Sequence, residues 1–299
     1  MRATWIAVDW GTTHLRAWAM DHNDAVLAEA RSDDGMGRLA RDAFEPALLQ
    51  LIAPWLGPGI TRVVACGMVG ARQGWAEAPY RAVPCAAAAG ALVKAPARDP
   101  RLDVRLVPGI KQDSPADVIR GEETQIAGYL AQLSGFNGVL CLPGTHAKWV
   151  HISAGEIVSF RTFLTGELFA LLSETSVLRH SVAPAGWDAA AFQAALAETL
   201  SRPETLAAGL FNLRAEALLH DQAPETARAR LSGLLIGAEL AAARAYWLGQ
   251  EVALIGAPAL TALYADALAA QGLAATRTDG AAMTRAGLAA AHAALKEPT

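Results

Sequence analysis

Short apolar runs alternate with turns of small and polar residues in the first part of the chain. The run over residues 5–9 ends in the acid Asp9 and is followed by the turn Gly11-Thr12-Thr13. Apolar runs over 15–20 and 25–28 come next, divided by a polar cluster. Runs of this length between turn residues are typical of strands. The pattern therefore predicts a meander of three strands whose first turn is rich in glycine and threonine.

The same pattern returns in the middle of the chain. Apolar runs over 139–142, 148–152 and 157–160 are again divided by turns, and the first of these turns is Pro143-Gly144-Thr145-His146. Gly144 follows Gly11 by 133 residues. A repeat of this kind predicts two lobes of one design.

Strand-like and helical patterns alternate over the rest of the chain. Further strands are expected over 61–66, 101–107 and 251–255, and a helix begins near Gly121. Alanine-rich helical patterns follow the second meander, over 189–200, 203–219, 227–248, 258–270 and about 281–297. This alternation indicates an α/β fold.

The composition excludes several classes of protein. Of 299 residues, 53% are hydrophobic and 18% charged, which is ample for a packed core and excludes disorder as the main state. A net charge of -4 without a basic run argues against a nucleic-acid partner. The longest stretch free of charged residues, 124–147, contains Gln, Asn, Pro and glycines, so no membrane span is expected. Three widely spaced cysteines predict buried free thiols and a cytoplasmic location.

Both glycine-threonine turns suit the binding of a polyphosphate. Backbone amides and the hydroxyls of Thr12 and Thr13 can hold phosphate oxygens, while Asp9 can hold a hydrated Mg²⁺. Gly144 and Thr145 offer the same groups in the second turn. An ordinary polar hairpin turn, duplicated by chance, remains the alternative. His146 and His151 lack a third ligand, so no further metal site is expected.

Two carboxylates open the helix near Gly121. At 100° per residue, Glu122 lies 40° from Ile126 and Glu123 lies 60° from it on the other side. The apolar stripe of this helix also includes Tyr129, Leu130 and Leu133, which places Glu122 nearer its middle and makes Glu122 the better candidate for a general base. Glu123 is the other candidate, and both acids could instead simply favour the helix dipole.

Weaker candidates lie near other turns. Gly256 follows the strand over 251–255 and would let an adenine or ribose lie against the backbone. Trp10, Trp75 and Trp149 stand near glycine turns and could flank a ligand.

These pieces, in this order, resemble the actin/hexokinase/Hsp70 ATPase superfamily, and within it the 2-dehydro-3-deoxygalactonokinase family. The resemblance spans nearly the whole chain. It is carried by the segments 6–18, 67–80, 120–125, 143–150, 160–168 and 231–239.

The resemblance implies a two-lobed actin-like ATPase (ribonuclease H-like) fold with an interlobe cleft. The first lobe would be residues 1–117, with the first phosphate turn and substrate contacts. The second would be 118–299, with the second phosphate turn, the adenosine turn and a last helix at the interlobe interface. The implied activity is transfer of the ATP γ-phosphate to the terminal hydroxyl of 2-dehydro-3-deoxy-D-galactonate in galactonate breakdown.

The implied site residues combine both lines of reasoning. Related sugar kinases usually have an aspartate base where this chain has Gly121-Glu122-Glu123, so the choice of base stays open. A substrate carboxylate suits a guanidinium, and Arg16, Arg120 and Arg161 lie beside the central motifs. The catalytic candidates are Glu122, Glu123 and Asp9, the last also for Mg²⁺. The ATP-binding candidates are Gly11, Thr12, Thr13, Gly144, Thr145, His146, Lys148 and Gly256, and the substrate candidates are Trp10 and the three arginines.

Other functions on this fold remain open at this point. A kinase for another sugar or sugar acid, an ATPase that uses water as the acceptor, and a non-enzymatic nucleotide or sugar sensor would share many of these residues. The apolar surface of the alanine- and leucine-rich helices is consistent with a homodimer.

Overall fold

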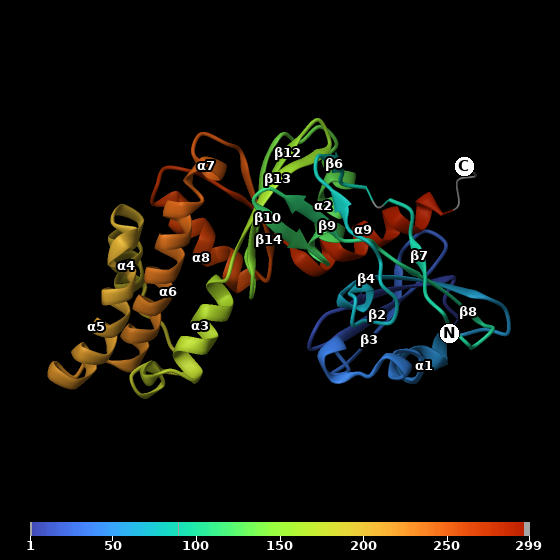
Figure 1. Ribbon diagram of the computed structural model, residues 1–299, viewed down its shortest axis with the longest axis horizontal. Helices are drawn as coiled ribbons and strands as arrows, with labels where there is room; N and C mark the ends of the chain where they lie inside the picture. Colours follow the sequence, from blue (N-terminus) through green and yellow to red (C-terminus); the bar gives the residue numbers. More distant parts are fainter. Residues whose placement is uncertain (1, 89, 296–299) are drawn as a thin grey trace. The chain divides into compact units, whose positions relative to one another are not determined.

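The computed structural model describes residues 2–88 and 90–295 and shows an α/β protein of two compact units (Figure 1). Unit 1 comprises residues 1–137, 152–159 and 280–299, and unit 2 comprises residues 138–151 and 160–279. This division differs from the predicted one after residue 117, because unit 1 continues to Asn137 and takes back the last helix. Residues 296–297 of that predicted helix lie outside the described part of the chain.

The main sheet of unit 1 has the strand order β3-β2-β1-β4-β8-β7. β1 pairs antiparallel with β2 and parallel with β4, which in turn is parallel to β8. The bounds are β1 Trp5–Trp10, β2 Leu15–Met20, β3 Val26–Ser32, β4 Thr61–Gly67, β7 Val93–Lys94 and β8 Leu102–Leu106. The predicted three-strand meander is confirmed, with its third strand longer than expected.

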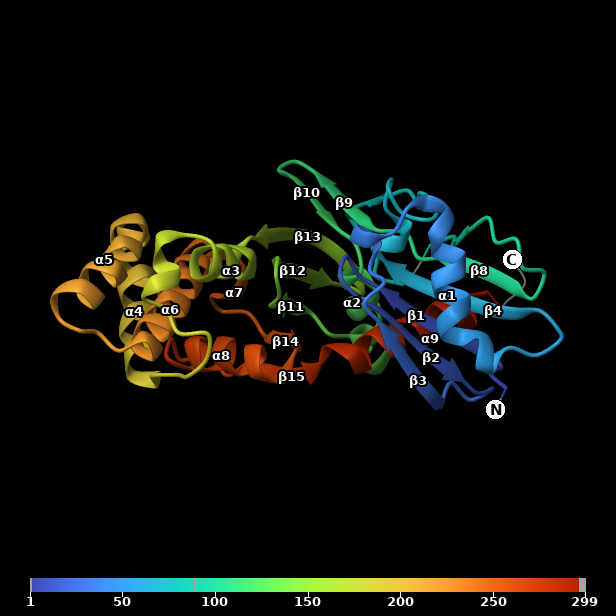
Figure 2. The same ribbon diagram turned by 90° about the horizontal axis from the view of Figure 1, so that it is seen from below.

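Alternate residues of β1 pack on opposite faces of this sheet. Ile6, Val8 and Trp10 belong to the core beneath α1 (Phe44–Ile52), which Figure 2 shows over the sheet. Trp5 and Ala7 face the other way and pack in the cluster that includes residues of α9 (Gly280–Ala294). Both faces of the strand are therefore buried, as its continuous apolar sequence requires.

Smaller elements complete unit 1. A second sheet has the order β10-β9-β5, and β6 pairs with the end of β13 that counts with this unit. Their bounds are β5 Arg81–Ala82, β6 Cys85–Ala86, β9 Ile110–Asp113 and β10 Ala116–Ile119. Short 3-10 turns cover Met36–Arg38, Arg41–Ala43, Ala53–Trp55 and Met68–Gly70.

Helix α2 (Glu122–Gln132) packs against α9 at very short range. A Cβ atom added to Gly128 would lie 2.0 Å from the carbonyl oxygen of Met283, and one added to Gly287 would lie 1.9 Å from that of Thr124. The two helix backbones thus touch through glycines, which fixes the position of the N-terminal turn of α2.

Gly128→Ala should therefore lower the free energy of unfolding by about 2 kcal/mol, even though alanine is the better helix former. The added methyl would force the backbones of α2 and α9 apart. Gly59→Ala is the matched control, because a Cβ there meets nothing within 4 Å. Thermal and urea unfolding of both variants would check this, and equal stability of the two would contradict the close packing.

Unit 2 contains a sheet that repeats the strand order of unit 1. Its order is β15-β14-β11-β12-β13, with β11 parallel to β14 and β14 parallel to β15. The bounds are β11 Gly138–Leu142, β12 Ala147–Ser153, β13 Glu156–Phe163, β14 Val252–Gly256 and β15 Thr276–Asp279. Read from β3 to β8 and from β13 to β15, the two sheets agree strand for strand, which confirms the predicted repeat.

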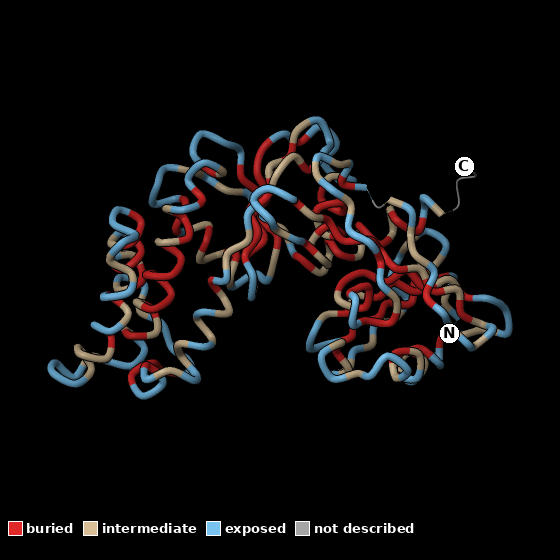
Figure 3. The backbone as a smooth tube through the Cα atoms, viewed as in Figure 1, coloured by how far each residue is buried: buried red, intermediate tan, exposed pale blue. Residues whose placement is uncertain are grey.

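The helices of unit 2 lie mostly after the second meander. α4 and α6 pack closely, since a Cβ on Gly233 or Gly237 would lie 2.4 Å from a carbonyl oxygen of α4. The bounds are α3 Thr165–Glu174, α4 Ala189–Ser201, α5 Leu206–Leu219, α6 Pro224–Ala242, α7 Arg244–Trp247 and α8 Pro258–Ala269, with 3-10 turns at Val177–His180 and Pro203–Thr205. Figure 3 shows the buried length of α6.

One predicted helix, over 227–248, is wrong in its extent. The chain breaks at Ala243 into α6 and α7, because the indole of Trp247 turns back and donates to the Leu240 carbonyl at 2.8 Å. The thiols of Cys66 and Cys141 are buried and free as predicted, whereas Cys85 is only half-buried. No helix among the described residues is both long and apolar enough to cross a membrane.

Candidate active site

Three segments of unit 1 come together at the end of β1. Asp9 of β1 is the register partner of Cys66 of β4, so the parallel strands end side by side. A Cβ on Gly67 would lie 2.6 Å from the Trp10 carbonyl, and one on Gly121 would lie 3.5 Å from the Gly67 Cα atom. The carboxyl ends of parallel strands are where α/β folds build ligand sites.

The first glycine-threonine turn is held by its carbonyl oxygens. The amide of Gly11 donates to the His14 carbonyl at 2.9 Å, and the amide of Gly35 donates to the Thr13 carbonyl at 3.2 Å. A Cβ on Gly35 would lie 2.2 Å from the Thr13 carbonyl carbon. Thr12 and Thr13 are exposed, and no hydrogen bond to their amides or hydroxyls is formed within the described part of the chain. Their donors are free to hold anionic oxygens.

Asp9 and Arg16, two predicted site residues, bind each other. Arg16 Nη2 donates to Asp9 Oδ2 at 2.5 Å, and its guanidinium carbon lies 5.8 Å from the Trp18 ring centre. The Asp9 side chain is 17% exposed, so a hydrated cation can reach it. Arg16 therefore neutralises Asp9 in this structure, a role that the sequence did not suggest.

The two acids of α2 differ in burial, and the difference is the reverse of the one the helical pattern suggested. Glu123 is 1% exposed, whereas Glu122 is half-buried. The reason is that α9 covers the side of α2 that carries Thr124 and Gly128, while Leu133 of the predicted stripe is 52% exposed. The Glu123 carboxylate accepts from the Gly121 amide at 2.5 Å and from the Thr124 hydroxyl at 3.0 Å.

Burial, and next the neighbouring Glu122 carboxylate, raise the pKa of Glu123 from 4.5 to about 7. The Cys66 thiol lies in the same cluster, since burial and the Asp9 and Glu123 carboxylates raise its pKa. Acidic groups from β1 and α2 are thus gathered around the end of β4.

The raised pKa of Glu123 gives a stability prediction with a definite sign. The folded protein keeps this group neutral up to about pH 7, whereas the unfolded chain ionises it near pH 4.5. The stabilisation is complete below pH 4.5 and is lost as the pH rises through 7, about 3 kcal/mol in all. Relative to wild type, Glu123→Gln should therefore gain about that much between pH 4.5 and 8. Urea unfolding across this range would show it, and parallel curves for the two proteins would refute it.

In unit 2 the two remaining predicted turns also end neighbouring parallel strands. Pro143 and Gly144 follow β11, and Gly256 ends β14. A Cβ on Gly256 would lie 3.3 Å from the Pro143 carbonyl oxygen. The second glycine-threonine turn and the predicted adenosine turn are therefore in contact.

The N-terminus of α3 packs on the second turn. A Cβ on Gly166 would lie 2.3 Å from the Gly144 carbonyl, and the Glu167 amide donates to the Thr145 carbonyl at 2.9 Å. The His146 imidazole and the Glu167 carboxylate form an exposed pair at 2.5 Å. Carbonyl oxygens again hold the turn, which leaves the Thr145 hydroxyl exposed.

A sequence model of the 2-keto-3-deoxy-galactonokinase family matches residues 9–291 of the chain. The chain belongs to this family. A Rhizobium meliloti (strain 1021) protein assigned as a 2-dehydro-3-deoxygalactonokinase is 42% identical over 97% of this chain and 96% of its own length. The Escherichia coli (strain K12) 2-dehydro-3-deoxygalactonokinase is 37% identical over 96% of this chain and 97% of its own.

Solved structures give the same result. A crystal structure from Sinorhizobium meliloti, of a protein assigned as a 2-dehydro-3-deoxygalactonokinase, has a TM-score of 0.92 and 41% identity, covering 98% of this chain and 100% of that one. The activator of 2-hydroxyisocaproyl-CoA dehydratase from Clostridium difficile, with bound ADPNP, has a TM-score of 0.55 at 12% identity over 99% and 98% of the two chains, which shows a shared fold. The predicted α/β, two-lobed actin-like fold is confirmed.

In this galactonokinase family member, three further predicted residues lie as follows. Trp10 is fully buried, stacks on Phe44 and donates to the Asp34 carbonyl, so it belongs to the core and not to the substrate surface. Lys148 is 5% exposed on β12. Arg161 of β13 is exposed, without an ion pair or hydrogen bond to the described residues.

Arg120 binds the segment that precedes β5. Its Nη2 donates to the Ala78 carbonyl at 2.8 Å, and its guanidinium carbon lies 4.3 Å from the Tyr80 ring centre. Its Nη1 is buried, with no hydrogen-bond partner in the part of the chain that the structure describes. Arg120 thus holds the loop that the sequence marked as a source of specificity.

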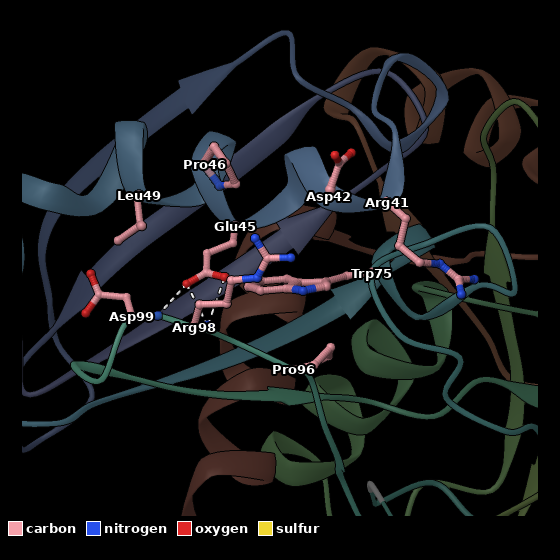
Figure 4. A pocket seen from close by; sticks show the side chains of 9 residues that line it. All are labelled: Arg41, Asp42, Glu45, Pro46, Leu49, Trp75, Pro96, Arg98 and Asp99. Carbon is pink, nitrogen blue, oxygen red and sulfur yellow. Dashed lines mark hydrogen bonds between the residues drawn. The ribbon is translucent and has the colours of Figure 1, made fainter.

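A cavity of about 780 Å³ in unit 1 lies apart from these residues (Figure 4). Trp75 lines it together with Leu49, Arg41 and Arg98, and the Glu45 carboxylate in its wall accepts from backbone amides. None of the predicted catalytic or ATP-binding residues lines this cavity.

Sequence reasoning missed the supports of the second turn in this kinase family member. Gly166 and Glu167 contact the turn directly, and Glu239 accepts a hydrogen bond from Thr165. The available signal was one acid within the apolar run over 231–240, which needs a buried partner.

Proposed function

We propose that this protein transfers the γ-phosphate of ATP to the terminal hydroxyl of 2-dehydro-3-deoxy-D-galactonate, a step of galactonate breakdown. The observation that carries the proposal is the match to a named 2-dehydro-3-deoxygalactonokinase over 96% of the chain. Two glycine-threonine turns with open donors and a pair of acids beside Asp9 provide the groups that this chemistry needs.

ATP would be held by backbone and hydroxyl donors of both turns, at Thr12, Thr13, Gly144 and Thr145. The Gly35 contact supports this, because the turn carbonyls are already occupied and the exposed donors are not. Gly256 would lie against the nucleoside, with His146 and Lys148 near the second turn. Positioning and neutralisation of charge supply most of the rate in phosphoryl transfer.

Mg²⁺ fits Asp9 as a single protein carboxylate. No group of three potential ligands occurs among the residues described, and Mg²⁺ in kinases is usually held by one or two carboxylates, phosphates and water. The ion would neutralise phosphate charge when bound. Arg16 would keep the Asp9 carboxylate ionised and oriented.

Glu122 would accept the proton of the attacking hydroxyl. Its half-buried position leaves it able to reach a substrate, whereas Glu123 is buried and hydrogen-bonded within α2. Arg161 would bind the substrate carboxylate, because Arg16 and Arg120 are already engaged by Asp9 and by the loop around Ala78.

We place the reaction in the cytoplasm, where ATP is present and the three free thiols stay reduced. The homodimer suggested by the sequence stays a prediction. The exposed apolar side chains of α5, among them Phe211 and Leu219, are consistent with it.

Release of ADP from Mg-ATP tests the function across a panel of acceptors. The panel contains 2-dehydro-3-deoxygalactonate, its gluconate-series epimer, aldonates and neutral hexoses, with a control lacking acceptor. The highest kcat/KM is expected for the galactonate-series acid. Equal ADP release without any acceptor would indicate an ATPase, and no release would favour a sensor.

A further inference from the structure

Unit 2 contains a buried carboxylate that the proposed reaction does not use. Glu239 of α6 is 3% exposed, and its carboxylate accepts three hydrogen bonds. Trp149 Nε1 donates to Oε1 at 2.7 Å, the Tyr264 hydroxyl donates to Oε2 at 2.7 Å, and the Thr165 hydroxyl donates to the same Oε2. Three donors offset the cost of burying this charge.

The three donors come from segments beside the two nucleotide turns. Trp149 lies on β12, which begins at Ala147 directly after the second glycine-threonine turn. Tyr264 lies on α8, which begins at Pro258 just after Gly256. Thr165 is the first residue of α3. One carboxylate therefore joins the strand that leaves one turn to the helix that follows the other.

The bond to Thr165 leads directly to the phosphate turn. No side chain caps the N-terminus of α3, so its first residue is held by Glu239 instead. The next two residues, Gly166 and Glu167, contact the Gly144 and Thr145 carbonyls. A shift of Thr165 would therefore shift the turn.

We propose that Glu239 is a positioning residue for ATP, because it fixes the Gly144-Thr145 turn relative to the Gly256 turn. The inference rests on the proposed function, in which these turns hold the phosphates and the nucleoside. Glu239 itself contacts neither turn and acts through Thr165, Trp149 and Tyr264.

Only a carboxylate can serve all three donors. A glutamine at this position has one accepting oxygen, so its NH₂ group would face either the Trp149 indole or the Thr165 and Tyr264 hydroxyls. Burial raises the pKa of Glu239, while its three donors lower it. The Glu239 charge also contributes to raising the pKa values of Tyr264 and Cys141.

Nucleotide affinity of the full chain tests the proposal by calorimetry with ATP, ADP and adenosine. Glu239→Gln should weaken ATP and ADP by about 10-fold or more, the usual effect of one lost buried hydrogen bond. Adenosine should change less than 2-fold, because it depends on the Gly256 turn alone. In turnover, KM for ATP should rise while KM for the acceptor at saturating ATP does not.

Two further variants separate positioning from general stability. Thr165→Val should reproduce the loss of phosphate-dependent affinity, and Thr165→Ser should restore it. Thr199→Val is the matched control, since it removes a buried 2.7 Å hydrogen bond to the α6 carbonyl of Leu234 without touching either turn. It should lower Tm and leave nucleotide affinity unchanged.

Unchanged ATP affinity in both Glu239→Gln and Thr165→Val would overturn the proposal, whatever their Tm. Failure of the proposed function is a separate result. A wild-type protein that binds ATP but phosphorylates no sugar acid refutes the kinase assignment and leaves the affinity comparison valid. A wild-type protein that binds no ATP refutes both.

Discussion

Glu122→Gln should lower kcat by at least about 100-fold and leave the affinity for ATP unchanged. General bases contribute about 10² to 10⁴ in rate, and the amide keeps the size of the side chain while losing the ability to accept a proton. Glu122 is half-buried at the first turn of α2, beside the cluster of Asp9, Cys66 and Glu123. Steady-state turnover and calorimetric ATP titration of the same preparation measure both quantities.

Glu123→Gln is the comparison for this experiment. Because Glu123 is buried and hydrogen-bonded to Gly121 and Thr124, its variant should retain turnover within about 10-fold at pH 8, a loss well below that of a missing base. Near-normal turnover of Glu122→Gln together with an inactive Glu123→Gln would reverse the two roles. Near-normal turnover of both would remove α2 from the chemistry.

Asp9→Asn should lower kcat by about 100-fold or more at any Mg²⁺ concentration, a loss similar to that of one preorganised electrostatic contact. The change removes the only carboxylate proposed for the ion and also releases Arg16, which Asp9 binds at 2.5 Å. A titration of activity with Mg²⁺ measures the effect.

Asp33→Asn is the matched control, because Asp33 also forms a pair with a neighbouring side chain, His14, but is 77% exposed. It should retain full activity. Full activity of Asp9→Asn at saturating Mg²⁺ would show that Asp9 holds neither the ion nor the geometry of the first turn.

The strands and turns of the two meanders could be predicted from the sequence because their signals are local. Asp9 and Gly11 at the end of one apolar run, and Pro143 and Gly144 at the end of another, mark the same junction twice. The pairing of β1 with β4 and of β11 with β14 then follows from the repeat.

The side-chain environments could not be predicted because they depend on distant contacts. The helical pattern placed Glu122 in the apolar stripe, but α9, about 160 residues further along the chain, buries Glu123 instead. The three donors to Glu239 are likewise 90, 74 and 25 residues away in sequence. A break such as that at Ala243 also depends on the tertiary fit of one side chain, Trp247.

The most direct test of the central claim is identification of the product. Wild-type protein, Mg-ATP and 2-dehydro-3-deoxygalactonate would be followed by ³¹P NMR and mass spectrometry. The account predicts one new phosphate monoester on the terminal carbon of the acid for each ADP formed. ADP that appears with inorganic phosphate and no sugar-acid ester, or an ester at another carbon, would contradict it.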